Sequence, residues 1–76
     1  MDDRQNLSER LARAELNIEK GRVHVERQER LIAELEAAGR SSPGDTQLLK
    51  HLQESLEFFE RHRDRLVAHI QELDGR

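Results

Sequence analysis

Apolar residues recur along this chain in two long stripes with the spacing of a coiled coil. In each stripe the intervals alternate between four and three residues, which keeps the side chains on one face of a helix. The pattern therefore predicts two long helices of similar length. The first stripe consists of Leu7, Leu11, Ala14, Ile18, Gly21, Val25, Gln28, Ile32 and Leu35. The second consists of Leu49, Leu52, Leu56, Phe59, Arg63, Leu66, Ile70 and Leu73.

A cluster of residues that break helices, positions 39–45, separates the two stripes and contains the one proline of the chain. Gly39 suits the position just after a helix, where it can adopt a positive φ. We expect a single domain with a helix over residues 3–38, a turn over residues 39–44 and a helix over residues 45–73. A connection this short makes the helices antiparallel, so the fold class is all-α, a two-helix antiparallel coiled-coil hairpin.

The helix starts leave alternatives open. Ser42 ahead of Pro43 suits an N-cap followed by proline at the first helical position, although Asp45 could be the cap instead. At the other end of the chain, Asn6 with Glu9 resembles a capping box, but Asp2 or Asp3 could start the first helix earlier.

The two stripes also predict which residues face each other. In an antiparallel hairpin, the end of the first stripe lies opposite the start of the second, next to the turn. This alignment repeatedly sets a large side chain against a small one. It also places Gln28 in the seam, where a polar residue fixes the register at some cost in stability. The predicted pairs include Leu35 with Leu49, Gln28 with Leu56, Val25 with Phe59, and Gly21 with Arg63.

Gly21 is the least expected residue of the first stripe. Glycine within a helix costs about 1 kcal/mol relative to alanine, which is reasonable where a bulky neighbour fills the space. In the predicted register Arg63 lays its methylene groups over Gly21 while its guanidinium reaches the edge of the seam.

Composition limits the possible partners. The chain has 76 residues, of which 34% are apolar and 38% are charged, with a net charge of -3 and no cysteine. Acidic and basic residues alternate, which leaves no basic patch for nucleic acid, and no apolar run could span a membrane or act as a signal. We expect a cytoplasmic protein that binds neither nucleic acid nor a membrane.

Some apolar residues lie outside the stripes. Ala12, Leu16 and Val23 fall on the outer side of the first helix, and Phe58 falls outside the second. A domain of this size has a marginal core, so we expect these residues to form an oligomer or partner surface. Our prediction is a homodimer in which two hairpins form a four-helix bundle, with a heterologous protein as a further possible partner.

Histidines are the remaining candidates for chemistry. In the predicted register His24 and His62 share one flank, which suggests a metal-binding or ligand-binding bundle as an alternative function. No Glu-x-x-His motif of the di-iron type occurs, and the serines have no evident histidine and aspartate partners for catalysis. We therefore predict an interaction module with no cofactor, no metal site and no enzymatic activity.

Several short motifs resemble those of a group of small proteins of unknown function that are frequent in alphaproteobacterial genomes. The matching residues cover roughly positions 17–70 and include Arg27-Gln28, Leu31, Leu35, Gly39, Asp45-Thr46, Leu48-Leu49 and Arg63-Asp64-Arg65-Leu66. The resemblance implies a helical hairpin with a Gly…Asp-Thr turn, and the turn here is longer than usual for the group. It implies no activity and no site residues.

Overall fold

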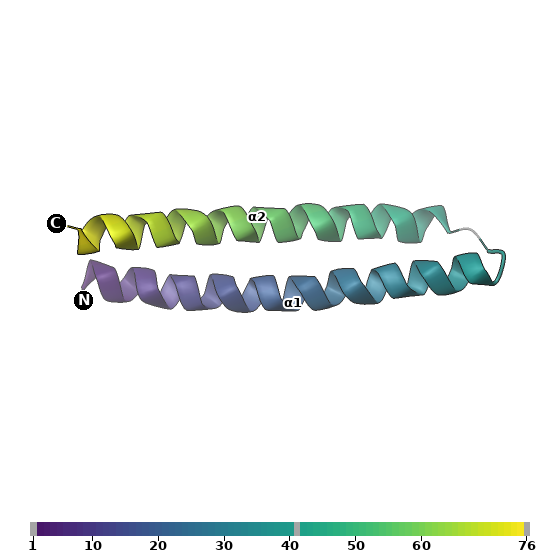
Figure 1. The fold of residues 1–76 in the computed structure, drawn as a ribbon, viewed down its shortest axis with the longest axis horizontal. Helices are drawn as coiled ribbons and strands as arrows, with labels where there is room; N and C mark the ends of the chain where they lie inside the picture. Colours follow the sequence, from purple (N-terminus) through teal and green to yellow (C-terminus); the bar gives the residue numbers. More distant parts are fainter. Residues whose placement is uncertain (1, 41, 76) are drawn as a thin grey trace.

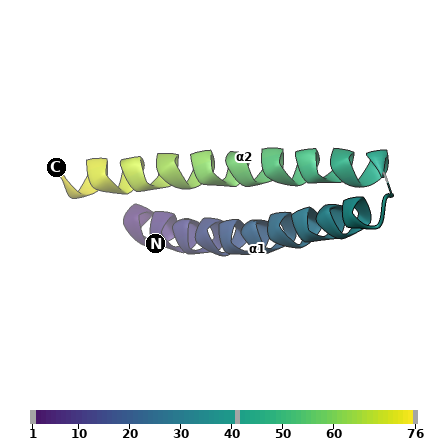
Figure 2. The same cartoon turned by 45° about the vertical axis from the view of Figure 1, so that its right-hand side comes forward.

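The computed structural model describes residues 2–40 and 42–75 and contains two long helices there, α1 (Asp3–Ala37) and α2 (Pro43–Asp74). The helices lie side by side and antiparallel, with both chain ends at the same end of the molecule (Figures 1 and 2). The hairpin is a rod of 59 × 15 × 14 Å. The two-helix hairpin predicted from the periodicity is confirmed.

Helix α1 begins early because Asp2 caps it. The Asp2 carboxylate accepts a hydrogen bond of 3.2 Å from the backbone N–H of Arg4, one of the donors that the helix itself leaves unpaired. Of the alternatives left open by the sequence, the earlier start is therefore the correct one.

Gly39 ends α1 as expected from its position. Its φ is 71°, and the turn closes with two backbone hydrogen bonds, from Gly39 N–H to Glu36 O at 2.9 Å and from Arg40 N–H to Leu35 O at 2.8 Å. These two bonds are those of a Schellman motif, which satisfies carbonyl groups in the last turn of a helix.

Helix α2 starts at Pro43, two residues earlier than the expected boundary. Ser42 is the N-cap through its backbone, because its carbonyl accepts from the N–H groups of Asp45 at 3.1 Å and Thr46 at 3.2 Å. Proline fits the first helical position, since its missing N–H would have no helical partner there. The first turn of α2 therefore already packs beside α1.

The core of the hairpin is the predicted seam. Among the described residues, each one that is buried belongs to one of the two stripes. The seam is thin, however, and none of its side chains is wholly enclosed. The buried residues are Leu7, Ala14, Ile18, Val25 and Gln28 of α1, and Leu66 of α2.

The register predicted within this seam is wrong by one heptad. A Cβ placed on Gly21 would lie 3.2 Å from Cδ1 of Leu56, so Leu56, and not Arg63, fills the space beside this glycine. Extending the same register sets Val25 opposite Leu52 instead of Phe59. Arg63 does reach the edge of the seam, where its Nε donates to Asp64 at 3.0 Å.

Gln28 explains the choice of register. Gln28 is 8% exposed, and its side-chain amide donates to the backbone carbonyl of Asp45 at 2.9 Å and to the Asp45 carboxylate at 3.2 Å. In the predicted register Gln28 would face Leu56 and its buried amide would lose these acceptors, at a cost of about 1–3 kcal/mol. Most of the apolar pairs fit both alignments, and this polar contact fits only one.

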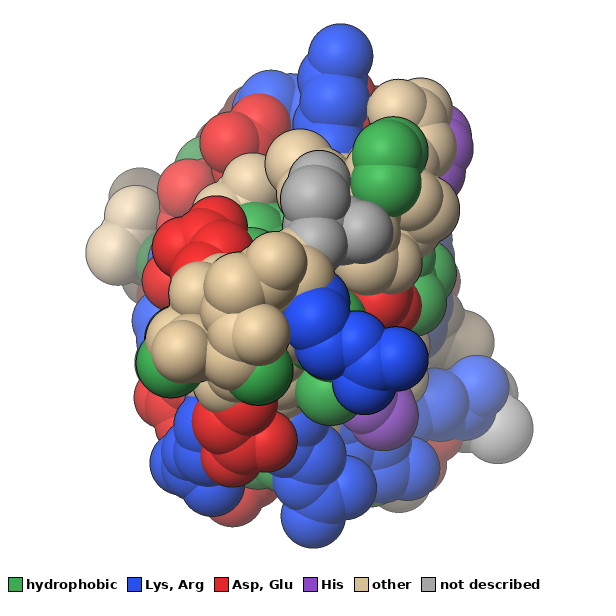
Figure 3. Space-filling view, turned by 90° about the vertical axis from the view of Figure 1, so that its right-hand side faces the viewer, with side chains coloured by type: hydrophobic (Ala, Val, Ile, Leu, Met, Phe, Trp, Pro, Cys, Tyr) green, Lys and Arg blue, Asp and Glu red, His purple; other side chains and the backbone are tan. Residues whose placement is uncertain are grey.

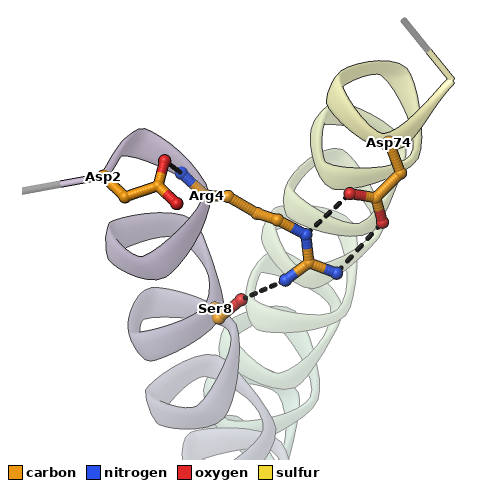
Figure 4. A network of polar contacts seen from close by, with 4 residues as sticks. All are labelled: Asp2, Arg4, Ser8 and Asp74. Carbon is orange, nitrogen blue, oxygen red and sulfur yellow. Dashed lines mark hydrogen bonds and ion pairs between the residues drawn. The ribbon is translucent and has the colours of Figure 1, made fainter.

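A second polar contact closes the open end of the hairpin (Figure 4). Arg4 donates from Nε to Oδ1 of Asp74 at 2.6 Å and from Nη2 to Oδ2 at 3.0 Å, and its Nη1 donates to Ser8 at 3.2 Å. This two-point contact joins the first turn of α1 to the last turn of α2. It is consistent with the register that Gln28 selects.

Candidate interaction surfaces

The outer face of α1 carries the predicted residues Leu16 and Val23. Their side chains are 48% and 39% exposed, and their positions in the heptad lie directly opposite the seam. Both line one shallow hollow of about 380 Å³, together with Glu19, Lys20 and other residues of α1. Ala12 is exposed one turn before Leu16, and the two line a neighbouring hollow.

Phe58 lies on a different surface. Its side chain is 57% exposed, and its ring stacks on that of His62, with centroids 6.4 Å apart and planes 6° apart. Phe58 and His62 line a hollow of about 360 Å³ between the helices, with Arg10 and Arg13 from α1. The structure therefore brings Leu16 and Val23 together and places Phe58 on a separate surface.

Leu31 and Leu48 are two further exposed apolar side chains near the turn. Both occupy the same heptad position, on the flank of the seam where Arg10 and His62 also lie. In the sequence they lie directly beside residues of the two stripes and widen them at their flanks. The sequence does contain a signal that separates them from the core. Both residues lie next to a seam position and not at one, because they fall outside the alternating spacing of three and four residues.

Charged residues sort into two sides along α1. One border of the outer face is acidic apart from Arg22, and the other border is basic apart from Asp3 and Glu34. The two signs alternate along the chain, but a helix brings together residues three and four apart, and this separates the two signs in space. The acidic border consists of Glu15, Glu19, Glu26, Glu29 and Glu36, and the basic border of Arg10, Arg13, Lys20 and Arg27.

An end-on view shows a related division over both helices. From the turn end of the hairpin, most of the visible acidic side chains gather on the left, whereas the visible histidine side chains lie on the right (Figure 3). The flanks of the rod therefore differ in chemistry, although the chain as a whole has a net charge of only -3.

His24 and His62 do not form the pair that the predicted register suggested. The shift of one heptad adds about 10 Å to their separation along the helix axis, and they line different hollows. Across residues 2–40 and 42–75, no group of three or more histidine, aspartate or glutamate side chains could hold a metal ion.

Two carboxyl groups are electrostatically distinct, and both lie at the ends of the rod. Hydrogen bonds from Ser42 and Gln28 lower the pKa of Asp45 below its ordinary value. The hydrogen bond with Arg4 likewise lowers the pKa of Asp74, and the same contact raises the pKa of the Arg4 guanidinium. These shifts belong to contacts that hold the two helices together.

Comparison of the chain with protein-family models, with curated proteins and with solved structures gives no match. Neither described helix is both long enough and apolar enough to cross a membrane. Function must therefore be inferred from the surfaces themselves.

Proposed function

We propose that this chain is a small protein-interaction module without catalytic activity, and that its first partner is a second copy of itself. Two hairpins joined through the outer face of α1 would place their four helices side by side in one layer, with the two α1 helices in the middle, because this face lies opposite the seam with α2. This arrangement is more open than the four-helix bundle predicted from the sequence. A cytoplasmic location and a further, heterologous partner are part of the same proposal.

The observation that carries this proposal is the amount of surface that the hairpin leaves exposed. Its accessible surface is 5855 Å². A monomeric protein of 8.9 kDa exposes about 4,800 Å² by the usual scaling with mass. The excess of about 1,000 Å² is similar to the roughly 800 Å² that each partner buries in a standard protein interface.

The chemistry of the surface supports the same proposal. Leu16, Val23 and Phe58 are exposed on the outer sides of a rod whose own core is a single thin seam. Scattered exposed leucines are ordinary on large proteins, but a short hairpin has little other apolar area with which to stabilise itself. Burial of these side chains against a partner would add to its stability.

Sedimentation velocity at micromolar concentration tests the proposal. We expect the wild type to sediment as a dimer and the double variant Leu16→Glu, Val23→Glu to sediment as a monomer, because burying two carboxylates in the contact is unfavourable. Circular dichroism checks that the variant remains helical. A stable, folded wild-type monomer would contradict self-association.

A matched control uses the other exposed surface. The double variant Leu31→Glu, Leu48→Glu introduces the same two charges at similarly exposed leucines near the turn. If this variant remains dimeric while the Leu16 and Val23 variant dissociates, the outer face of α1 is the contact. An affinity pull-down with the same two variants then asks whether a heterologous protein uses that face.

Ligand binding is a second candidate function, and the hollow beside Phe58 favours it. There a stacked pair of rings from Phe58 and His62 meets the cationic side chains of Arg10 and Arg13. Benzoate, a small aromatic anion, should raise the melting temperature if this hollow binds an anionic ligand, and His62→Ala should reduce that rise.

A further inference from the structure

The outer face of α1 has the charge pattern of a helix that pairs with itself in one orientation only. Leu16 and Val23 form its centre, with exposed acidic residues Glu19 and Glu26 on one border and exposed basic residues on the other. We propose that two copies of this chain associate through this face with their α1 helices parallel, about a two-fold axis that runs along the rods. This inference rests on the proposed self-association and specifies its geometry.

Symmetry links the charge pattern to the orientation. In a two-fold pair of parallel helices, the left border of one copy meets the right border of the other. Glu19 would therefore face Lys20 of the second copy, and Glu26 would face Arg27, on both sides of the contact. In an antiparallel pair each border meets itself, so glutamate would face glutamate and basic residues would face each other.

The four border side chains are free to make such pairs. Glu19, Lys20, Glu26 and Arg27 are all exposed, and none of them forms an ion pair or hydrogen bond within the described part of the hairpin. Exposed pairs contribute little stability individually, but pairs of like charge next to an apolar contact exclude an orientation effectively.

Two charged residues in line with Leu16 and Val23 along the outer face favour the antiparallel orientation. Glu9 and Arg30 would each meet their own counterpart in the parallel pair, and would meet one another in the antiparallel pair. They lie seven residues beyond Leu16 and Val23, at the ends of the apolar stretch, where solvent screens them. The border residues adjoin the apolar contact directly, so they have the larger influence on orientation.

The other faces of the hairpin fit a second copy less well. A dimer through the flank that carries Phe58 would bring Arg10 and Arg13 of the two copies into one interface. Such clustering of like charge costs free energy that the few apolar residues there would have to offset. The outer face of α1 is the surface on which apolar contact and charge complementarity coincide.

A border-exchange variant tests the orientation. It carries Glu19→Lys, Lys20→Glu, Glu26→Lys and Arg27→Glu, which exchanges the charges of the four border residues beside Leu16 and Val23 and leaves the net charge unchanged. We expect the variant to form dimers with itself as well as the wild type does. Circular dichroism and melting temperature confirm that it folds.

The decisive measurement is native mass spectrometry of a refolded equimolar mixture of the variant with isotope-labelled wild type. In the parallel arrangement a mixed dimer sets like charges against each other on both sides. Random pairing would make half of all dimers mixed, and we expect the mixed fraction to be lower than this by a factor of at least about five. Preferential mixed dimers would show the antiparallel arrangement, and statistical mixing would show that this face is not the interface. Either result overturns the inference while leaving self-association intact, whereas a monomeric wild type refutes the proposed function itself.

Cysteine trapping provides an independent readout, because the natural chain contains no cysteine. Parallel α1 helices bring the two copies of Val23 together, so Val23→Cys alone should form a disulfide-linked dimer under mild oxidation. An antiparallel pair would instead link Val23→Cys of one copy to Leu16→Cys of another, and this outcome would contradict the inference.

Discussion

Gln28 illustrates how one polar side chain can determine an arrangement that many apolar residues leave undecided. Its amide is buried and bonded to the backbone and the side chain of Asp45. A leucine in its place would pack in the seam in either of two alignments. The sequence identifies Gln28 as a residue that fixes register, but its acceptor is visible only in the folded hairpin.

The lowered pKa values of Asp45 and Asp74 predict how stability depends on pH. Their folded-state pKa values lie below those of the unfolded chain, about 3.9 for aspartate, so the folded state binds fewer protons in this range. The contribution of the two carboxylates to the free energy of unfolding is therefore complete above about pH 5 and is lost as the pH falls below about 4. Urea unfolding across pH 2–7 measures this dependence.

The control for this prediction removes the two carboxylates. In the variant Asp45→Asn, Asp74→Asn we expect a shallower loss of stability on acidification. High salt should weaken the contribution of Asp74 to stability more than that of Asp45. Asp74 and its partner Arg4 are equally exposed, whereas Gln28, the partner of Asp45, is buried. An unchanged pH profile in the double variant would contradict the assignment.

At the level of elements, the helix ends decide where the two helices meet. Helix α1 ends through the positive φ of Gly39, and α2 starts at once through Ser42 and Pro43. Because α2 begins at Pro43, Asp45 lies within its first turn, where its carbonyl and carboxylate oxygens accept hydrogen bonds from Gln28.

Two glycines near the turn provide a matched test of this view. An added Cβ would meet no atom within 4 Å at Gly39 or at Gly44, but only Gly39 has a positive φ, of 71°. We expect Gly39→Ala to destabilise the hairpin by about 1 kcal/mol, because alanine disfavours that conformation. Gly44→Ala should instead stabilise it by up to about 1 kcal/mol, because alanine favours the helix.

Chemical denaturation of the two variants checks this prediction. Since both positions have space for a methyl group, any difference between them reports backbone conformation. Equal effects at the two positions would mean that the Schellman turn contributes little to the stability of the hairpin.

At the scale of the molecule, the hairpin is a rod whose seam could slide by one heptad and keep most of its apolar residues paired, although Leu7 at the open end would lose its contacts with α2. The observed register places Val25 opposite Leu52, and the alternative places Val25 opposite Phe59. Polar contacts at Gln28 and at the open end select the first alignment. Removing the contact at Gln28 should therefore populate the second.

Disulfide trapping measures this directly. The pair Val25→Cys, Leu52→Cys should close readily in the otherwise wild-type chain, and the pair Val25→Cys, Phe59→Cys should not, because the second pair lies too far apart along the axis. Adding Gln28→Leu should increase closure of the second pair. If the second pair closes equally well with and without Gln28, another contact sets the register.

The amino-acid sequence by itself determined the two helices, the turn at Gly39 and the residues that form the seam. It could do so because helix periodicity and cap chemistry are local properties, and the stripes and the breaker cluster express them directly. It also identified Leu16, Val23 and Phe58 as apolar residues outside the seam, all three of which are exposed in the structure.

Only the tertiary structure decided the register, the separation of His24 from His62, and the division of the exposed apolar residues between two surfaces. A heptad repeat is unchanged by a shift of seven residues, so the apolar pattern cannot distinguish alignments that differ by one repeat. That choice depends on contacts such as the one between Gln28 and Asp45, which join residues far apart in the chain. Such contacts exist only after the two helices have met.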